Sequence, residues 1–239
     1  MTTHNRSCNG TSNGFSDFDL RDIDELGDNH VSTSIETPMR PDAHQLNDQD
    51  KIRIISEHME HILHTLGMDL SDDSLQGTPQ RVAKMYVQEV FSGLNPKNKP
   101  EVRLFENSYG YNEMLLEKDI SVYSYCEHHL VPIFGRAHVA YFPKDKVIGL
   151  SKINRLVKYY ARRPQVQERL TLQIAREFRD LLETDDVAVI IDSHHMCVSS
   201  RGIEDTQSST VTAKYYGRFK EHETRSELLR YIGGTNQVR

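Results

Sequence analysis

Residues 119–126 read DISVYSYC and residues 133–142 read IFGRAHVAYF, and these two stretches decide the fold class. Both are rich in β-branched and aromatic residues with partial alternation of apolar and polar positions, which predicts two strands. The sequence Pro143-Lys144-Asp145 predicts a turn after the second strand. The all-apolar stretch 187–191 predicts a buried strand, and residues 208–216 predict a further one.

Helices are predicted ahead of these strands. Apolar side chains recur at helical spacing between residues 52 and 66, with Asp48 or Asp50 available as the N-cap and a glycine at position 67 to end the helix. Thr78-Pro79 supplies a capping hydroxyl followed by proline at the first helical position, which predicts a second helix that closes near Gly93.

Three more helices are predicted among and after the strands. Ser151 is a candidate N-cap for one helix, apolar side chains between residues 170 and 181 indicate a second, and Thr224-x-x-Glu227 has the form of a capping box for a third. The resulting order is helices, strands, helices, strands and helix. This order predicts an α+β fold rather than a regularly alternating α/β fold.

The first 48 residues differ in composition from the rest. They are rich in Asn, Ser, Thr, Asp and Gly, which predicts a disordered, acidic N-terminal tail over 1–48 and a single folded domain over 49–239. Within the domain we expect N-terminal helices over about 50–93 and a core over about 100–235. Residues 1–50 hold ten acidic and three basic side chains, a charge of −7 against −6 for the whole chain, so the remainder carries +1.

Several classes of protein are disfavoured by these patterns. No apolar run approaches the roughly 20 residues of a membrane-spanning helix, and the first 20 residues lack the apolar core of a signal peptide. Three cysteines do not make a disulfide scaffold, so we expect a reduced, cytoplasmic protein. A body near neutrality argues against a general nucleic-acid surface.

Two short clusters combine cysteine with histidine: Cys126-Glu127-His128-His129 and His194-His195-Met196-Cys197. Cys126 and His129 are spaced so that one loop could supply two zinc ligands, and Cys197 could supply the third, which leaves one position open as in catalytic zinc sites. His128 and His195 would then flank the metal as acid–base candidates. The alternatives are ordinary buried cysteines with histidines that are satisfied on the surface or in the core, or a disulfide between the two cysteines.

A second constellation favours anions. In Gly149-Leu150-Ser151-Lys152-Ile153-Asn154-Arg155, a predicted helix N-terminus lies beside two basic side chains, which suits a phosphate; the alternative is a capped helix with solvated charges. Further along, a carboxylate such as Glu168 could accept hydrogen bonds from the N1–H and 2-amino group of guanine, or could simply favour the helix dipole.

The chain from about residue 50 to 235 resembles the GTP cyclohydrolase I family. The stretches that carry the resemblance are Thr78–Tyr86 (TPQRVAKMY), Cys126–His129 (CEHH), Val147–Arg155 (VIGLSKINR), Arg163–Leu170 (RPQVQERL) and His195–Gly202. Met196 departs from the aromatic residue that some members have between the histidine and the cysteine.

The resemblance implies the tunnelling fold (T-fold), an antiparallel sheet with helices on one face. It implies a ring-forming homo-oligomer of the allosteric type, a decamer of two stacked pentamers with active sites at subunit interfaces. The implied enzyme is a cytoplasmic, zinc-dependent hydrolase that binds GTP and converts it with water into 7,8-dihydroneopterin triphosphate and formate. This reaction opens folate biosynthesis, a branch of one-carbon metabolism, or the synthesis of tetrahydrobiopterin, another pterin.

The resemblance also implies residue roles. One Zn²⁺ per subunit would be held by Cys126, His129 and Cys197. His195 would protonate N7 of the guanine, and His128 would assist ring opening, while Ser151 would help in the ribose steps. The implied guanine-binding residues are Glu168 and Gln167. The implied triphosphate-binding residues are Lys152, Arg155 and Arg201, joined by Arg81 from a neighbouring subunit, and Leu150 is a further substrate-binding residue.

Two other functions remain as alternatives. A related enzyme on the same fold could act on another purine or pterin, and a non-catalytic zinc-stabilised ring could serve as a binding module. The first would be favoured by the absence of the metal ligands or of Glu168, and the second by replacement of His128 or His195. All of these residues are present, so the cyclohydrolase is the preferred interpretation.

Overall fold

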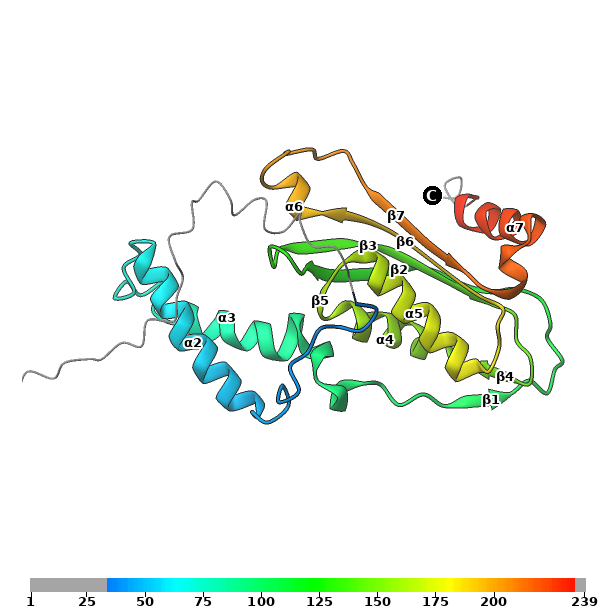
Figure 1. Ribbon diagram of the computed structural model, residues 1–239, viewed down its shortest axis with the longest axis horizontal. Coiled ribbons are helices and arrows are strands. Elements are labelled where there is room, and N and C mark those ends of the chain that lie inside the picture. Colours follow the sequence, from blue (N-terminus) through cyan, green and yellow to red (C-terminus); the bar gives the residue numbers. More distant parts are fainter. Residues whose placement is uncertain (1–33, 235–239) are drawn as a thin grey trace, which may run out of the picture. The chain divides into compact units, whose positions relative to one another are not determined.

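The computed structural model describes residues 34–234, which contain two β-sheets and helices on both faces of the larger one (Figure 1). Residues 1–33, most of the expected tail, lie outside the described part. The elements, in chain order, are α2 (Asp48–Thr65), α3 (Thr78–Met85), η2 (Tyr86–Val90), η3 (Ser92–Leu94), η4 (Pro96–Asn98), β1 (Leu104–Glu106), β2 (Leu115–Cys126), β3 (Pro132–Tyr141), β4 (Lys146–Ile148), α4 (Leu150–Ala161), β5 (Pro164–Gln165), α5 (Gln167–Leu182), β6 (Val187–His195), α6 (Met196–Ser199), β7 (Thr210–Tyr215), η5 (Gly217–Lys220) and α7 (His222–Gly233).

The larger sheet has the strand order β5-β2-β3-β6-β7. Strands β2, β3, β6 and β7 pair antiparallel, as expected, whereas the two-residue β5 pairs parallel to the end of β2. The sheet is therefore mixed at one edge, because the chain returns from α4 beside β2 in the direction of that strand. A separate two-stranded sheet joins β1 to β4.

Helices α4 and α5 cover one face of the larger sheet. Alternate residues of β2, β3 and β6 point to this face and form the main core with Leu156, Ile174 and Phe178 of the two helices. Each such side chain, when fully buried, contributes roughly 1.5–3 kcal/mol. The α+β class predicted from the element order is confirmed by this arrangement.

The opposite face is not bare, which corrects the expectation of helices on one face only. The intervening residues of the same strands, Ala140 and Ile190 among them, pack with Phe219 of η5 and Leu228 of α7 in a second core. Figure 1 shows α7 on the side of the sheet away from α4 and α5. The period-two alternation of the strands supplies both cores.

Four helix starts differ from those predicted. Helix α3 already includes Thr78, which was expected to cap it, and its N-cap is Gly77 with no side-chain hydrogen bond. The N-cap of α2 is Asn47, whose side chain accepts from the Asp50 amide, rather than Asp48 or Asp50. Helix α4 begins one residue before Ser151, after Gly149. Helix α7 begins at His222, so the predicted capping box lies inside it. In each case the hydrophobic periodicity located the helix, and the neighbouring backbone determined its first residue.

Gly93 joins the N-terminal helices to the end of α4. Its amide donates to the Arg162 carbonyl at 2.9 Å, and a Cβ at this position would lie 2.1 Å from the Tyr159 carbonyl oxygen. Only glycine allows this approach of two backbones. In the described residues, no helix has the length and apolar character needed to cross a membrane.

A buried histidine lies at an irregularity in the ladder between β2 and β3. Asp119 has φ of +60° where the register shifts, and its amide donates to Nδ1 of His138 at 3.2 Å. Burial lowers the pKa of His138, an effect that Asp119 and Asp192 oppose and Arg136 and Lys118 reinforce. The neutral ring is therefore the form that the folded chain holds.

We expect His138 to make the folded chain less stable in mild acid. Since its folded pKa lies below the unfolded value of about 6.5, its stabilising contribution is complete above that pH and is lost as the pH falls through the folded pKa. His138→Asn retains an acceptor for the Asp119 amide but does not titrate. The fall in melting temperature between about pH 7 and pH 5 should shrink in this variant, with His44→Asn, an exposed histidine, unchanged as the control; equal slopes in all three proteins would contradict the assignment.

Candidate active site and metal centre

The loop between β2 and β3 carries the first cluster. Strand β2 ends at Cys126, whose amide donates to the Val131 carbonyl and whose carbonyl accepts from the Leu130 amide at 2.8 Å. Leu130 has φ of +52°, which closes the turn tightly. As a result, Nδ1 of His129 lies 3.9 Å from the Cys126 sulfur and Nδ1 of His128 lies 3.8 Å from it.

The second cluster reaches the same edge of the sheet through strand pairing. Ser124 of β2 and His195 of β6 both pair with Ile133 of β3, so the ends of β2 and β6 lie on either side of the start of β3. The short helix α6 begins directly after His195 and turns Cys197 toward the loop. One ligating atom from each of Cys126, His129 and Cys197 lies within 4.8 Å of the others.

The chemistry of these three donors fits a zinc ion. Burial, followed by the proximity of Cys126, raises the pKa of the Cys197 thiol to about 11. A divalent cation between the two sulfurs would reverse this effect on Cys197, because zinc takes thiolates as ligands. Two sulfurs and one imidazole form a three-ligand set that leaves a position open.

His195 is held by a side chain from the first turn of α5. The Gln167 amide nitrogen donates to the carbonyls of Ile191 and Thr210, at 3.1 and 2.8 Å, and to the Thr212 hydroxyl. The amide oxygen therefore faces Nε2 of His195, 2.7 Å away. Because this oxygen can only accept, Nε2 carries the hydrogen and Nδ1 is the nitrogen left for proton transfer.

Two charged side chains border this cluster. Arg201 donates to Nε2 of His129 at 2.8 Å, so a guanidinium lies directly beside the candidate metal-ligand set. Glu168 is exposed at the start of α5, and its carboxylate raises the pKa of His195 against the larger lowering effect of burial. The substrate contacts that the resemblance implies for both residues stay predictions.

The predicted substrate-binding residues within Gly149–Arg155 lie at the other end of the sheet. Ser151 and Arg155 are exposed in the first turns of α4, whose Asn154 donates to Glu117 near the beginning of β2. Helix α4 has 12 residues, about 18 Å of helix, and the chain reaches β5 beside Cys126 only after its far end. The structure thus does not bring Leu150, Ser151, Lys152 and Arg155 to the candidate metal ligands of their own chain.

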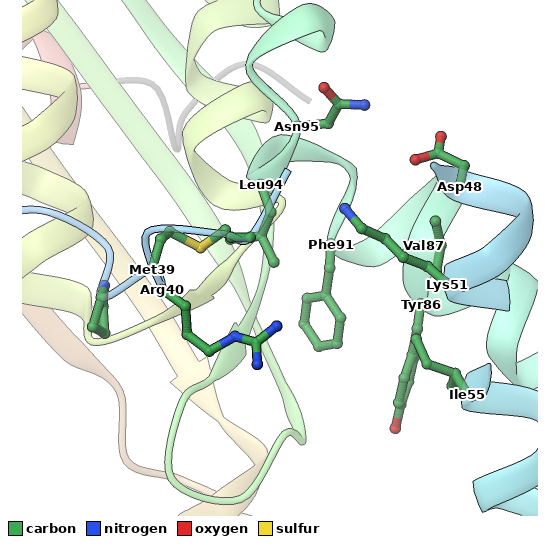
Figure 2. A pocket seen from close by; sticks show the side chains of 12 residues that line it. Met39, Arg40, Asp48, Lys51, Ile55, Tyr86, Val87, Phe91, Leu94 and Asn95 are labelled. Carbon is green, nitrogen blue, oxygen red and sulfur yellow. The ribbon is translucent and has the colours of Figure 1, made fainter. Parts of the chain in front are cut away.

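Arg81 is engaged within the N-terminal helices. Its guanidinium donates to the Ser74 carbonyl at 3.1 Å and to the Thr78 hydroxyl at 2.9 Å. A cavity of about 450 Å³ lies in the same region, between residues 38–43 and helices α2 and η2. Figure 2 shows Arg40 and Lys51 beside the aromatic side chains of this cavity, and none of the predicted site residues lines it.

Sequence reasoning missed one buried charge next to the metal ligands. Arg169 is 3% exposed and forms a two-pronged ion pair with Glu127, one of its two bonds measuring 3.2 Å. Both residues lie inside the motifs that carry the resemblance. They are 42 residues apart, so the spacing of residues within either motif does not indicate that they pair. An arginine among the apolar positions of a helix was the available signal, since such a residue is seldom buried unpaired.

An α+β domain with a Cys-His-Cys set and a fixed histidine defines a candidate metal-dependent enzyme. Comparison with known proteins makes the assignment specific. Residues 55–233 match the family described as GTP cyclohydrolase I. A GTP cyclohydrolase 1 from Flavobacterium johnsoniae is 58% identical over 210 residues, which cover 88% of this chain and 94% of that protein.

Enterobacterial proteins are also similar. GTP cyclohydrolase 1 of Citrobacter koseri is 52% identical over 203 residues, and that of Escherichia coli K12 is 51% identical; each comparison covers 84% of this chain and 91% of the relative. The chain belongs to the GTP cyclohydrolase I family, and its activity is that of a GTP cyclohydrolase. The resemblance inferred from the motifs is confirmed.

We expect Cys197→Ser to lose most of its bound zinc, because a serine hydroxyl does not replace a thiolate as a zinc ligand. The measurement is zinc content per chain after gel filtration, which also reports whether the variant keeps the elution volume of the unaltered chain. Cys8→Ser, in the segment outside the described residues, is the matched control and should keep the zinc content of the unaltered chain. Full zinc content in the Cys197 variant would exclude this residue as a ligand.

Proposed function

We propose that this chain converts GTP and water into 7,8-dihydroneopterin triphosphate and formate in the cytoplasm, at a zinc site held by Cys126, His129 and Cys197. The observation that carries the proposal is the convergence of these three donors beside His195, in a member of the GTP cyclohydrolase I family. Zinc in such a site would supply a Lewis acid that makes water a stronger nucleophile near neutral pH. We assign one ion per subunit.

His195 is the proton donor to N7 of the guanine in this proposal. Gln167 accepts from its Nε2–H, so the imidazolium form of the ring would donate its second proton from Nδ1. We assign the Gln167 side chain to this positioning role rather than to guanine, because its amide already has partners on both atoms. His128, exposed in the loop and close to the Cys126 sulfur, is the second acid–base group for opening the ring.

Recognition of guanine falls to Glu168. Its exposed carboxylate lies electrostatically close to His195, and a carboxylate can accept from both the N1–H and the 2-amino group. Arg201, on the metal side of the site, is suited to bind the triphosphate with its planar fork of donors. These two side chains would orient the purine with its five-membered ring toward the metal ligands.

The remaining phosphate-binding residues come from a second subunit in this proposal. Leu150, Ser151, Lys152 and Arg155 begin a helix about 18 Å long that separates them from the metal ligands of their own chain. A ring in which the α4 start of one chain meets the metal ligands of the next would complete the site. We propose that the chain forms such a ring homo-oligomer, a decamer of two stacked pentamers, with Arg81 contributed by a neighbour.

The direct test incubates the purified chain with GTP and measures formate together with a fluorescent pterin after oxidation. Both products should form in equal amounts and fall to background after zinc is removed with a chelator, then return on adding zinc back. Products that persist in the zinc-free protein would contradict the metal-dependent chemistry. Bound zinc with no turnover of GTP would shift the assignment to another purine or pterin.

A mixing experiment tests the shared site. Cys197→Ser damages the metal side and Lys152→Met the phosphate side, so each variant alone should be nearly inactive. If the two sides belong to different chains, reassembling an equimolar mixture should restore about a quarter of the activity, because some interfaces pair two intact sides. Activity that stays at the level of the separate variants would show that each chain builds its own site.

A further inference from the structure

The segment Ser34–Thr37, here called the strap, lies along helix α5 and is bound to it by successive turns. Arg169 donates from Nε to the Ser34 carbonyl at 2.7 Å, and Gln173 donates to the Ile35 carbonyl at 3.0 Å. Arg176, the next residue on this side of the helix, pairs with the Glu36 carboxylate at 2.8 Å. The two inner bonds use main-chain oxygens of the strap.

The same two α5 side chains also hold the neighbours of a metal ligand. Arg169 pairs through its two terminal nitrogens with Glu127, the residue after Cys126. Gln173 accepts from the Gln165 amide group at 2.9 Å, and the Gln165 backbone pairs with Cys126 and accepts from the Glu127 amide. The strap, helix α5, Glu127 and Gln165 therefore form one connected network of polar groups around Cys126.

The side chains of this network are buried, so their polar groups need hydrogen-bond partners within the protein. Arg169, Gln173 and Gln165 are 3%, 5% and 0% exposed. A buried guanidinium is stable only when its donors are paired, and the Ser34 carbonyl of the strap accepts from Nε while Glu127 accepts from the two terminal nitrogens. Without the strap, water would enter and the fixed orientation of Arg169 would be lost, and the carboxylate that anchors the metal loop would be released with it.

We propose that the strap is a positioning element for the metal centre: through Arg169 and Gln173 it fixes Glu127 and Gln165, and thereby the geometry of the Cys126–His129 loop. The proposal rests on the proposed zinc site for its effect on metal binding. Its effect on the loop itself does not depend on the metal. Arg169 is a positioning residue here, because it reaches the ligands only through Glu127.

Two truncations separate the strap from the rest of the N-terminal segment. Removing residues 1–33 leaves the strap in place, whereas removing residues 1–37 deletes it and leaves α5 unaltered. Hydrogen exchange of a peptide covering residues 124–132 should be the same in the first truncation as in the full chain, and at least about tenfold faster in the second. Zinc transfer to a chromophoric chelator should accelerate by on the order of tenfold in the second only.

A matched pair of substitutions tests the helix side. Arg169→Lys keeps the charge but loses the fork that serves three oxygens, so it should reproduce the faster zinc release and lower kcat more than it raises the KM for GTP. Arg176→Lys alters the exposed pair on the same side of α5 and should behave like the unaltered chain. If Arg169→Lys does not fold, the comparison of the two truncations still tests whether the strap positions the loop.

Equal loop exchange in the two truncations, both folded by circular dichroism, would overturn the positioning role. Unaltered loop exchange together with fast zinc release would also overturn it, since the metal would then be lost by another route. A full-length chain that binds no zinc contradicts the metal assignment instead, and in that case the exchange comparison alone judges the strap.

Discussion

The register of the β2–β3–β6 ladder is the constraint on which the rest of the structure depends. Side chains alternate between faces, so a slip of one residue would turn every inward position outward. The pairing of Ile133 with both Ser124 and His195 brings Cys126 and Cys197 to one edge. The apolar side chains that enforce this register, such as Val122, Val139 and Val189, are fully buried against α4 and α5. Core packing therefore determines the distance between the two sulfurs.

Much of this arrangement could be predicted from the sequence, and the physical reasons differ between elements. The strands around IFGRAHVAYF and the helix over residues 52–66 carry strong periodic patterns, and they form where expected. The Cys-His-Cys set was predicted from ligand chemistry and spacing, and its three donors do converge. Patterns that repeat along one element, or chemistry confined to a few residue types, can be recognised without coordinates.

Contacts made between distant segments could not be predicted in the same way. Nothing local to Gln167 indicates that its amide would hold His195, and a guanine contact was the natural expectation from the motif. The position of α7 on the second face of the sheet is equally non-local, because a strand pattern does not say which helix covers each face. The parallel pairing of β5 depends on where α4 ends. These features follow from topology, which periodicity does not encode.

The approach of Gly93 to the end of α4 has a mechanical consequence. The two backbones are in direct contact, so no side chain lies between them that could change its rotamer when one of them moves. A shift of the N-terminal helices must therefore carry Arg162 with it, and the chain from Arg162 reaches the strand beside Cys126 within three residues. The N-terminal helices and the strand beside Cys126 are thus linked by a direct backbone contact and three residues of chain.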